Sequence, residues 1–352
     1  MIDQSIFREY DIRGTVPEQL NNNSIDIIAN AIAAKCSAES INTLALGRDG
    51  RLSGPEIMQA LSSGLKKRGI NVVNVGLVTS PLLYFAAKKM DSKSGVMITG
   101  SHNPKNYNGF KVVINDAPIS GVELLSFISK EISDSEILGQ ESHQEGLMND
   151  YITEVCSQTT NIKRMKVVVD CGNGAAGEIA PKLMRALGHE VIELFCDIDG
   201  NFPNHHPDPG KPENLHDLIK SVKENNADLG VAFDGDGDRL GVISDLGEMI
   251  FPDQVMMIFA QDVLSRNKNA QIVFDVKCSN LLAQVIETAG GIPVMSPTGH
   301  FHIKNALKKS GAPLAGEMSG HIFFNDTWYG FDDGHYSAFR LTEIIAQLGK
   351  PL

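Results

Sequence analysis

One turn and one acidic cluster hold the residues whose types and spacing suit chemistry. The turn, at residues 99–104, follows an apolar run typical of a buried strand, residues 95–99. Gly100 allows the backbone to turn sharply, and the Asn-Pro pair that follows prevents a helix from starting at once. Ser101 is therefore expected at the end of a strand, where open α/β sheets bind their ligands. Because a serine hydroxyl is a weak nucleophile by itself, we expect a metal ion to assist it.

The acidic cluster is the stronger of the two signals. Asp234, Asp236 and Asp238 alternate with glycines, so a tight loop can point all three carboxylates inward. Two like charges about 4 Å apart repel by about 4 kcal/mol near a protein surface, so such a cluster needs a cation. Its oxygen ligands favour Mg²⁺, Mn²⁺ or Ca²⁺ over zinc. An EF-hand is excluded because Arg239 and Asp245 stand where that loop needs Gly and Glu, whereas a solvated acidic turn stays open as an alternative.

Simpler interpretations of the serine turn also exist. A serine beside Asn-Pro is common in turns that have no catalytic role, and the G-x-S-x-G pattern of hydrolases is missing. His102 follows Ser101 directly, and because neighbouring side chains on an extended turn usually diverge, we do not expect it to act as the base. Lys111 is the better candidate partner, provided that residues 110–114 form a strand beside the one that delivers Ser101.

A third pattern, at Gly172, Gly174 and Gly177, has the G-x-G-x-x-G spacing of a dinucleotide-binding loop. It follows an expected strand, precedes an expected helix and has Glu193 or Asp197 as an acidic residue further along the chain. A metal cluster and a serine turn have no place in a simple dehydrogenase, however. We therefore favour close helix–strand packing as the role of this turn.

Further polar residues fall on turns between expected strands and helices. Each of them alone is compatible with a solvated turn, but several at the same end of successive strands indicate one shared cleft. They are Lys277, His300, Glu317, Ser319 and His321.

A unit of strand, loop, helix, glycine and strand occurs three times along the chain. The first strands of the copies are expected at residues 43–47, 166–170 and 271–275, and the helices that follow at residues 55–68, 178–187 and 280–289. Ser53 is expected to cap the first helix, and Pro55 suits its first turn. The pattern predicts an α/β protein of three similar domains, each with a mixed sheet sandwiched by helices.

Two polar joins divide the chain into the domains that we expect at residues 1–145, 146–248 and 249–352. Residues 133–149 are charged and poor in large apolar side chains, and residues 245–248 suit a hairpin turn. The first domain would carry the serine turn, the second the acidic loop and the third the turn at residues 316–321.

The composition of the chain limits the classes of partner and the cellular compartment that we expect. The net charge of −12 over 352 residues argues against nucleic acid and anionic membranes as partners. Five cysteines without a C-x-x-C pair indicate a reducing compartment. No stretch approaches about 18 apolar residues, and the first residues lack a signal-peptide pattern, so we expect a cytoplasmic protein that is a monomer or a weak oligomer.

Five stretches together resemble the α-D-phosphohexomutase superfamily, in order from Phe7 to Leu348. They are residues 10–14 (YDIRG), 99–104 (TGSHNP), 108–111 (NGFK), 234–239 (DGDGDR) and 316–321 (GEMSGH). The last is similar to the sugar-reading loop of the bacterial phosphomannomutase/phosphoglucomutase branch, whereas the phosphoglucosamine mutase branch typically has Gln where this chain has Met318.

The resemblance implies roles for individual residues. Ser101 is implied to be a phosphoserine in the resting enzyme, with one of its phosphoryl oxygens and the carboxylates of Asp234, Asp236 and Asp238 as the ligands of Mg²⁺. The positions implied to surround the transferring phosphoryl group are Arg13, Lys111 and Arg239. The substrate-contacting positions are Tyr10, Lys277, His300, Glu317 and Ser319, of which the last two bind sugar hydroxyls, and the implied proton carrier is His321.

The implied activity is the interconversion of a hexose 6-phosphate and a hexose 1-phosphate, of mannose or glucose, through a sugar 1,6-bisphosphate. Family members normally carry a fourth, C-terminal domain that grips the phosphate that is not reacting. We expect that domain to be absent from this chain, with weak turnover as the consequence. Two alternatives remain from the residues alone: a Mg²⁺-dependent phosphatase that uses Ser101, and a sugar-phosphate-binding protein without catalysis.

Overall fold

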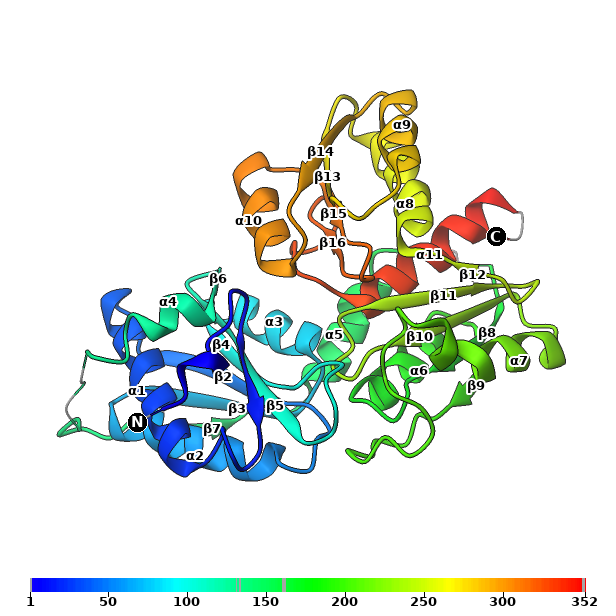
Figure 1. Cartoon of the computed structure of the whole chain (residues 1–352). Helices are drawn as coiled ribbons and strands as arrows, with labels where there is room; N and C mark the ends of the chain where they lie inside the picture. Colours follow the sequence, from blue (N-terminus) through cyan, green and yellow to red (C-terminus); the bar gives the residue numbers. More distant parts are fainter. Residues whose placement is uncertain (1, 131, 133, 160–162, 350–351) are drawn as a thin grey trace. The chain divides into compact units, whose positions relative to one another are not determined.

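The computed structural model describes residues 2–130, 132, 134–159, 163–349 and 352, and Figure 1 shows its helices and strands. The chain forms two compact units, Met1–Met148 with Asp199–Asn201 and Asn149–Ile198 with Phe202–Leu352. The first unit is built on one sheet and the second on two. Helices flank all three mixed sheets, so the chain has the three α/β domains that the alternation of strands and helices predicts.

The first unit folds around a seven-stranded sheet in the order β1-β5-β4-β2-β3-β7, with β6 paired to β5. Its strands are β1 (Ile12–Thr15), β2 (Thr43–Arg48), β3 (Asn71–Leu77), β4 (Gly95–Ile98), β5 (Tyr107–Ile114), β6 (Ala117–Ile119) and β7 (Glu141–His143). Its helices are the 3₁₀ helix η1 (Gln4–Ile6), α1 (Asn22–Ala38), α2 (Gly54–Lys67), α3 (Ser80–Lys89) and α4 (Gly121–Leu125). Strands β2, β3, β4 and β7 pair in parallel, whereas β5 runs antiparallel to both β4 and β1.

Side-chain alternation along β2 sorts the helices onto the two faces of this sheet. Successive side chains of a strand point to opposite faces. Leu44 and Leu46 belong to the hydrophobic core that residues of α1 and α2 complete. Gly47 faces the other way, where a Cβ on it would lie 3.3 Å from a methyl group of Leu83 on α3. Helix α3 therefore packs closely because β2 is small on that side.

The second unit begins with a five-stranded sheet in the order β12-β11-β10-β8-β9. Its strands are β8 (Lys166–Asp170), β9 (Glu190–Leu194), β10 (Leu229–Phe233), β11 (Leu240–Ser244) and β12 (Met249–Ile250). The helices in this part of the chain are α5 (Leu147–Cys156), α6 (Ala176–Ala186), the 3₁₀ helix η2 (Pro212–Leu215) and α7 (His216–Asn225). Strands β8, β9 and β10 are parallel, whereas β11 and β12 return antiparallel.

The other sheet of the second unit has four strands in the order β14-β13-β15-β16. Its strands are β13 (Gln271–Asp275), β14 (Ile292–Ser296), β15 (Leu314–Gly316) and β16 (Ile322–Phe324), and its helices are α8 (Pro252–Arg266), α9 (Asn280–Thr288) and α10 (His300–Ser310). The final helix, α11 (Gly334–Leu348), packs against α8. It also contacts β11 of the five-stranded sheet and α6, a helix that flanks that sheet. One helix thus ties together the two sheets of this unit.

The same hairpin arrangement recurs in all three sheets. In each, a strand that pairs in parallel with the sheet interior is followed directly by a strand that returns antiparallel beside it. The pairs are β4 with β5, β10 with β11, and β15 with β16. The serine turn, the acidic loop and the turn at residues 316–321 are the connections within these three pairs, so hydrogen bonds of a ladder hold each of them at both ends.

Most of the expected elements are present, but one local expectation, the cap of the first helix, is wrong. The expected helices at residues 55–68, 178–187 and 280–289 correspond to α2, α6 and α9. Ser53 makes no capping hydrogen bond, because its Oγ instead accepts one from Asn108 Nδ2 at 2.9 Å. Residues 133–149, expected as a polar link between domains, also include β7, which pairs with β3; residue 133 itself is outside the described residues.

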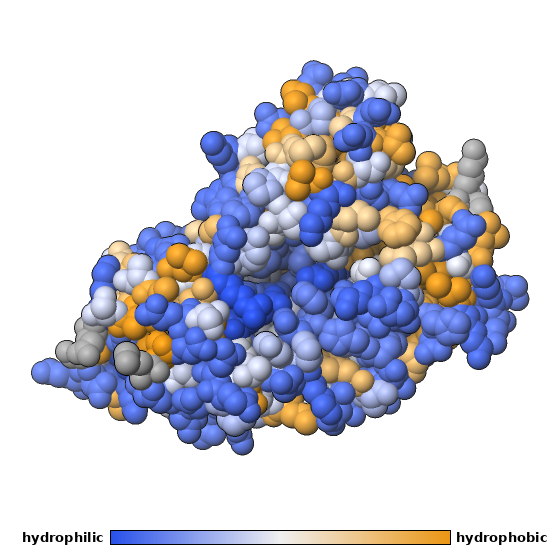
Figure 2. Space-filling model, in the orientation of Figure 1, coloured by the Kyte–Doolittle hydropathy of each residue, from blue (hydrophilic) through white to orange (hydrophobic). Residues whose placement is uncertain are grey.

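The surface is mixed in character. On the face shown in Figure 2, hydrophilic residues cover most of the view and hydrophobic ones form separate groups. Large apolar side chains that are strongly exposed occur in both units, and examples are Leu52, Leu138 and Leu246. Single exposed apolar side chains are normal in folded proteins. Among the described helices, none is both long enough and apolar enough to span a membrane.

The glycine-rich turn after β8 serves close packing, as the sequence suggests. A Cβ on Gly177 would lie 1.9 Å from the carbonyl oxygen of Cys196, and one on Gly174 would lie 2.9 Å from the Cα of Gly235. Ala175 N also donates to the carbonyl oxygen of Gly235 at 3.0 Å. The turn therefore packs against the acidic loop and donates a hydrogen bond to it. Its lack of a side chain at Gly177 also allows α6 to approach the end of β9.

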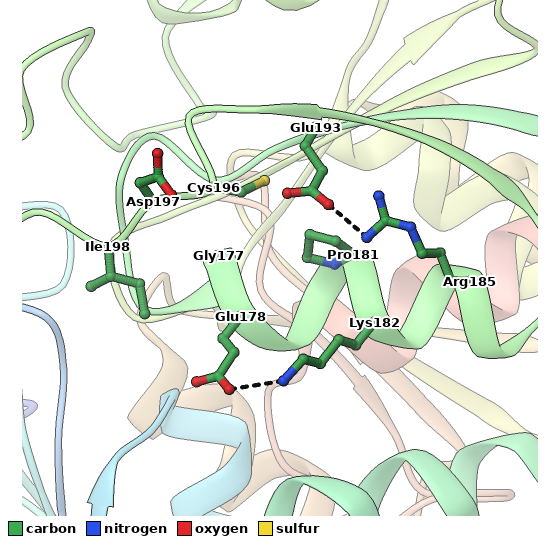
Figure 3. Close-up of a pocket in the computed structure, with 9 residues that line it drawn as sticks. All are labelled: Gly177, Glu178, Pro181, Lys182, Arg185, Glu193, Cys196, Asp197 and Ile198. Carbon is green, nitrogen blue, oxygen red and sulfur yellow. Dashed lines mark hydrogen bonds and ion pairs between the residues drawn. The ribbon is translucent and has the colours of Figure 1, made fainter.

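A pocket beside α6 carries charges that already pair with one another (Figure 3). Glu193, an acidic residue of the dinucleotide interpretation, forms an ion pair with Arg185 at 2.6 Å. Glu178 likewise pairs with Lys182 at 2.8 Å, one helical turn away. Glu193, one of the two candidate acidic residues, is thus paired with an arginine, and packing explains Gly174 and Gly177, so we favour the packing role of this turn over dinucleotide binding.

We expect Gly177→Ala to destabilise the protein by about 3 kcal/mol, the upper part of the range for an overpacked site. The added methyl group meets backbone, which cannot move aside as a flexible side chain can. Urea unfolding of the variant measures the change. Gly210→Ala is the matched control, because the nearest atom to its Cβ is Asp208 Oδ1 at 3.3 Å. Equal stability of the two variants would contradict the packing role.

Candidate active site

The expected site residues lie in two groups, one in each unit. Those of the first unit are Tyr10, Arg13, Ser101 and Lys111. Those of the second unit are Asp234, Asp236, Asp238, Arg239, Lys277, His300, Glu317, Ser319 and His321.

The serine turn is held in an uncommon backbone conformation. Ser101 has a φ of 49°, in the left-handed region that residues other than glycine rarely adopt. Its backbone N donates to Thr99 Oγ1 at 2.7 Å, and that hydroxyl donates in turn to Asp49 Oδ2 at 2.7 Å. The turn is thus fixed from inside by a buried side chain, Asp49, which the sequence analysis did not single out.

Strands next to the serine turn carry two of the expected cations. Residues 110–114 do pair beside the serine strand, with Lys111 opposite Met97 in the β4–β5 ladder. Thr99 N donates to Gly109 O at 3.0 Å, and Arg13 on β1 lies opposite Gly109. Arg13 and the start of the serine turn therefore occupy one row across three strands, and Lys111 lies two residues further along β5.

The segment before β1 holds Arg13 in place. Arg13 Nε donates to Asp11 Oδ2 at 2.7 Å, and Asp11 is buried. Tyr10 directly precedes this aspartate and is half-buried. Both residues lie on the N-terminal side of a strand whose own position is fixed by β5.

His102 lies closer to the serine than expected. Its Nδ1 is 3.2 Å from Ser101 Oγ, within hydrogen-bond distance. The expectation that neighbouring side chains diverge holds for extended backbone, whereas Ser101 has the left-handed backbone noted above. The contact is a correction to the sequence analysis, although it adds no third residue of a triad.

The acidic loop of the second unit gathers three buried carboxylates. Asp234, Asp236 and Asp238 follow β10 directly, and their side chains offer oxygen atoms that all lie within 4.8 Å of one another. The backbone N atoms of Asp238 and Arg239 donate to Asp234 Oδ1 at 3.1 Å and 3.2 Å. Buried carboxylates with no bulk solvent around them repel strongly, and an all-oxygen donor set of this size fits a hard divalent cation.

His321 lies between two buried carboxylates. Its Nε2 is 3.2 Å from Asp238 Oδ1, and its Nδ1 is 3.1 Å from Glu317 Oε2. Burial alone would lower the pKa of this imidazole, and Arg239 lowers it further, but the two carboxylates outweigh both effects and raise the pKa to about 9. The cation-free protein therefore holds a proton on His321 at neutral pH.

The turn at residues 316–321 is held by hydrogen bonds to buried acids. Met318 N donates to Asp275 Oδ1 at 3.3 Å, and Asp275 is the last residue of β13. Glu317 Oε1 accepts from Gly299 N at 2.5 Å, and Ser319 Oγ lies 2.9 Å from a ring nitrogen of His321. Burial raises the pKa of Glu317, but the hydrogen bond with His321 outweighs it and lowers the pKa, so Glu317 is an anion.

A second charged cluster lies beside His321, and in it the expected His300 is joined by Lys304 and Asp332, which were not anticipated. Lys304 Nζ is 2.5 Å from Asp332 Oδ1, and both side chains are buried. His300 Nδ1 is 3.8 Å from Asp332 Oδ2, and its ring lies 5.6 Å from that of His321. Asp332, His321 and Asp238 also offer atoms within 4.8 Å of one another, but the ammonium of Lys304 already supplies positive charge there. The acidic loop is therefore the better cation site.

Helix α11 begins against the acidic loop. Its N-cap residue, Asp333, accepts hydrogen bonds from Tyr151 Oη at 2.7 Å and Trp328 Nε1 at 3.0 Å. Burial raises the pKa of Asp333 to about 7. Gly334 follows, and a Cβ there would lie 2.7 Å from the carbonyl oxygen of Arg239. This close approach explains why a glycine starts the helix. The sequence signal for these two buried acids was the acidic pair at residues 332–333, which was missed.

Lys277 is the least fixed of the expected residues in the second unit. It follows β13, its side chain is exposed, and its backbone N donates to Asp275 Oδ1 at 3.2 Å. Asp275 Oδ1 also accepts from Met318 N, so the same carboxylate holds the backbone of Lys277 and the turn at residues 316–321. An exposed ammonium at this place suits a ligand that carries a phosphate.

Comparison with protein families covers almost the whole chain. The models for the phosphoglucomutase/phosphomannomutase α/β/α domains I, II and III match residues 4–135, 148–247 and 251–352. A phosphomannomutase/phosphoglucomutase of Pseudomonas syringae pv. tomato is 52% identical over 349 residues, 99% of this chain and 75% of that protein. A phosphoglucomutase of Neisseria gonorrhoeae is 50% identical over 357 residues, 99% of this chain and 77% of that protein.

A solved structure agrees with these relatives. The crystal structure of a phosphoglucomutase/phosphomannomutase family protein from Burkholderia thailandensis has a TM-score of 0.94 at 46% identity and covers 99% of this chain and 78% of that one. The chain thus spans about three quarters of the length of the proteins it matches. The chain belongs to the phosphoglucomutase/phosphomannomutase family, and its activity is the interconversion of hexose 6-phosphates and hexose 1-phosphates.

Proposed function

We propose that this mutase works through a phosphoserine at Ser101 and through Mg²⁺ held by Asp234, Asp236 and Asp238. The observation that carries the proposal is the buried triad, whose oxygens lie within 4.8 Å of one another. Its negative charge calls for a cation, and its all-oxygen chemistry favours Mg²⁺ over zinc. A phosphoryl oxygen on Ser101 would be a further ligand.

The proposed transfer exchanges one phosphorus–oxygen bond for another. A hydroxyl oxygen of the sugar attacks the phosphorus on Ser101, the bond to Oγ breaks, and a sugar 1,6-bisphosphate forms. When bound, Mg²⁺ would neutralise charge on the transferring group. The second half-reaction returns the other phosphoryl group of the bisphosphate to Ser101. The hydroxyl proton passes to a base, for which we propose His321 in its neutral form, which a cation bound at Asp238 would favour; its Nε2 lies 3.2 Å from Asp238 Oδ1.

The remaining charged and polar groups are proposed to bind the two ends of the substrate. Arg239 carries a guanidinium within 3.8 Å of Asp234 Oδ2, and it suits the transferring phosphoryl group. Arg13 and Lys111 are proposed to neutralise the same group from the strands beside Ser101. The proposed contacts with the sugar and its other phosphate are Glu317, Ser319, His300, Lys277 and Tyr10. Glu317, as an anion, can accept hydrogen bonds from two sugar hydroxyls.

The wider setting is proposed on the same basis. Hexose phosphates are the proposed partners, and a cytoplasmic monomer or weak oligomer is the proposed form. Its five cysteines are free thiols, which supports a reducing compartment. We propose domain boundaries after residues 145 and 248; the second is supported by the hairpin turn in which Ser244 N donates to Glu248 O at 2.9 Å, and the first lies near the division between the two compact units after Met148.

Incubation with glucose 1,6-bisphosphate and Mg²⁺ is expected to add one phosphoryl group to the protein, at Ser101. Intact-mass measurement followed by peptide mapping detects it. Ser101→Ala should gain none, whereas Ser126→Ala, which changes an exposed serine of the same unit, should gain one as the parent does. A parent protein that never gains the group would refute the phosphoserine mechanism.

Mg²⁺ is expected to raise the melting temperature, because a ligand that binds only the folded state stabilises it. Asp236→Asn should lose most of this rise, with Mg²⁺ affinity about 100-fold lower, yet melt no lower than the parent without the metal, since one of three repelling charges is gone. Thermal melting across a Mg²⁺ titration measures both effects. Asp217→Asn on the exposed face of α7 is the control and should keep the full rise.

His321 is expected to titrate near pH 9 in the metal-free protein, against 6.5 for an unperturbed imidazole. Its contribution to stability is complete below pH 6.5 and is lost as the pH rises towards 9. Urea unfolding of metal-free protein should show this loss, and His321→Gln should not. Mg²⁺ bound at Asp238 should lower the NMR titration midpoint of the imidazole; a midpoint near 6.5 without metal would contradict the assigned contacts.

A further inference from the structure

A buried guanidinium lies directly beneath the serine turn. Arg51 is three residues beyond the end of β2, and its side chain is 0% exposed. Its partner of opposite charge is Asp49, whose Oδ2 lies 3.2 Å from Arg51 Nε. Burying a charged pair costs several kcal/mol per ion unless its hydrogen-bonding groups are satisfied. A fold that keeps such a group in its interior therefore needs many acceptors around it.

Those acceptors come from the serine turn and from the first residue of β5, Tyr107. Arg51 Nη2 donates to the carbonyl oxygens of Ser101 and Asn103, both at 2.7 Å. Arg51 Nη1 donates to the carbonyl oxygens of Pro104 and Tyr107, at 2.7 Å and 2.9 Å. Together with the bond from Nε, every N–H of the guanidinium has an acceptor. Four of the five bonds end on a stretch of seven residues that begins with the serine.

The turn has a conformation that needs such support. The left-handed backbone of Ser101 costs on the order of 1 kcal/mol for a residue with a Cβ. Gly100 leaves room for the guanidinium, since a Cβ there would lie 2.5 Å from Arg51 Cζ. Asp49 closes the network, because its Oδ2 accepts from both Arg51 Nε and Thr99 Oγ1, and Thr99 Oγ1 accepts from Ser101 N. The backbone of Ser101 is thus held through its N and its O by one connected group.

We propose that Arg51 is a positioning residue for phosphoryl transfer, which fixes the carbonyl groups of the turn so that the oxygen of Ser101 is presented in one orientation. The inference rests on the proposed function of Ser101. Arg51 itself lies behind the turn and is bound to its backbone, so it acts through Ser101. Phosphoryl transfer depends mainly on positioning, and a displacement of about 1 Å can slow a reaction about 100-fold.

Lysine cannot replace this arginine. The guanidinium presents its five N–H groups in a rigid planar fork, which matches four carbonyls spread over residues 101–107. An ammonium group keeps the charge but has three donors at one point, so it leaves carbonyl oxygens of the turn without a donor. Arg51→Lys therefore separates the loss of this geometry from the loss of charge.

The test compares Arg51→Lys with Arg68→Lys. Arg68, the residue that follows α2, is a matched control because it also binds an aspartate and a carbonyl, but these are Asp26 on α1 and Gly64 on α2 and not residues of the turn. With glucose 1,6-bisphosphate as phosphoryl donor, Arg51→Lys should phosphorylate Ser101 about 100-fold more slowly. KM for the donor should change by less than about 3-fold, and Mg²⁺ affinity should stay at that of the parent, since the groups proposed to bind both are intact. Arg68→Lys should keep the parent rate.

Equal rates for the two lysine variants would overturn the inference. Hydrogen–deuterium exchange of the peptide that spans residues 99–107 provides an independent readout, and it should be faster in Arg51→Lys alone. If the parent itself accepts no phosphoryl group, the phosphoserine proposal fails, and exchange in this peptide still decides whether Arg51 holds the turn. Unchanged exchange would then refute that as well.

A second variant covers the case in which Arg51→Lys does not fold. Thr99→Val keeps the shape of the side chain and the whole of Arg51, and it removes the hydroxyl that links Asp49 to Ser101 N. We expect about a 10-fold slower phosphorylation of Ser101, with no change in Mg²⁺ affinity, because one of the two links to the serine backbone is lost. Phosphorylation at the parent rate would refute the role of this network.

Discussion

Buried negative charge is the constraint on which the second unit depends. Asp234, Asp236 and Asp238 are fully buried, and each would be unfavourable without groups that compensate it. Part of that compensation comes from backbone N atoms at the end of the loop and from the guanidinium of Arg239. Another part comes from the proton that the raised pKa of His321 keeps on its imidazole. The proposed cation would supply the rest and displace the need for a proton on His321. Binding of the cation and release of the proton from His321 are therefore coupled through the same buried carboxylates.

The first unit meets the opposite problem in a different way. There the buried charge that needs acceptors is a cation, Arg51, and one carboxylate and four carbonyl oxygens surround it. Carbonyl dipoles are fixed by the chain, so they hold the turn rigid and leave no place for an exchangeable ion. A loop of carboxylates can bind and release a cation, whereas a loop of carbonyls around a guanidinium cannot change its partner. This difference agrees with the proposed metal site in one unit and the proposed nucleophile in the other.

Regular patterns in the sequence predicted the architecture, but contacts between distant segments were beyond them. The alternation of strands and helices gave α2, α6 and α9, and the Asp-Gly repeat gave the acidic loop. Arg51 was missed because its acceptors lie about fifty residues away and no spacing rule connects them. Lys304 and Asp332 were missed for the same reason. The contact of His102 with Ser101 was not predicted. It depends on the left-handed backbone of Ser101, a conformation that the residue type of a non-glycine residue does not indicate.

The three hairpins explain why these distant residues can act with precision at all. A parallel strand normally leads into a long crossover, usually a helix, so the residues after it do not return along the same ladder. Here β4, β10 and β15 each return at once through an antiparallel partner, so the ladder fixes both ends of the turn. One buried acid also anchors each turn through hydrogen bonds: Asp49, after β2, for the serine turn, Asp234 within the acidic loop, and Asp275, at the end of β13, for the turn at residues 316–321. Side chains on such turns have few alternative positions, which is the preorganisation that phosphoryl transfer requires of its surroundings.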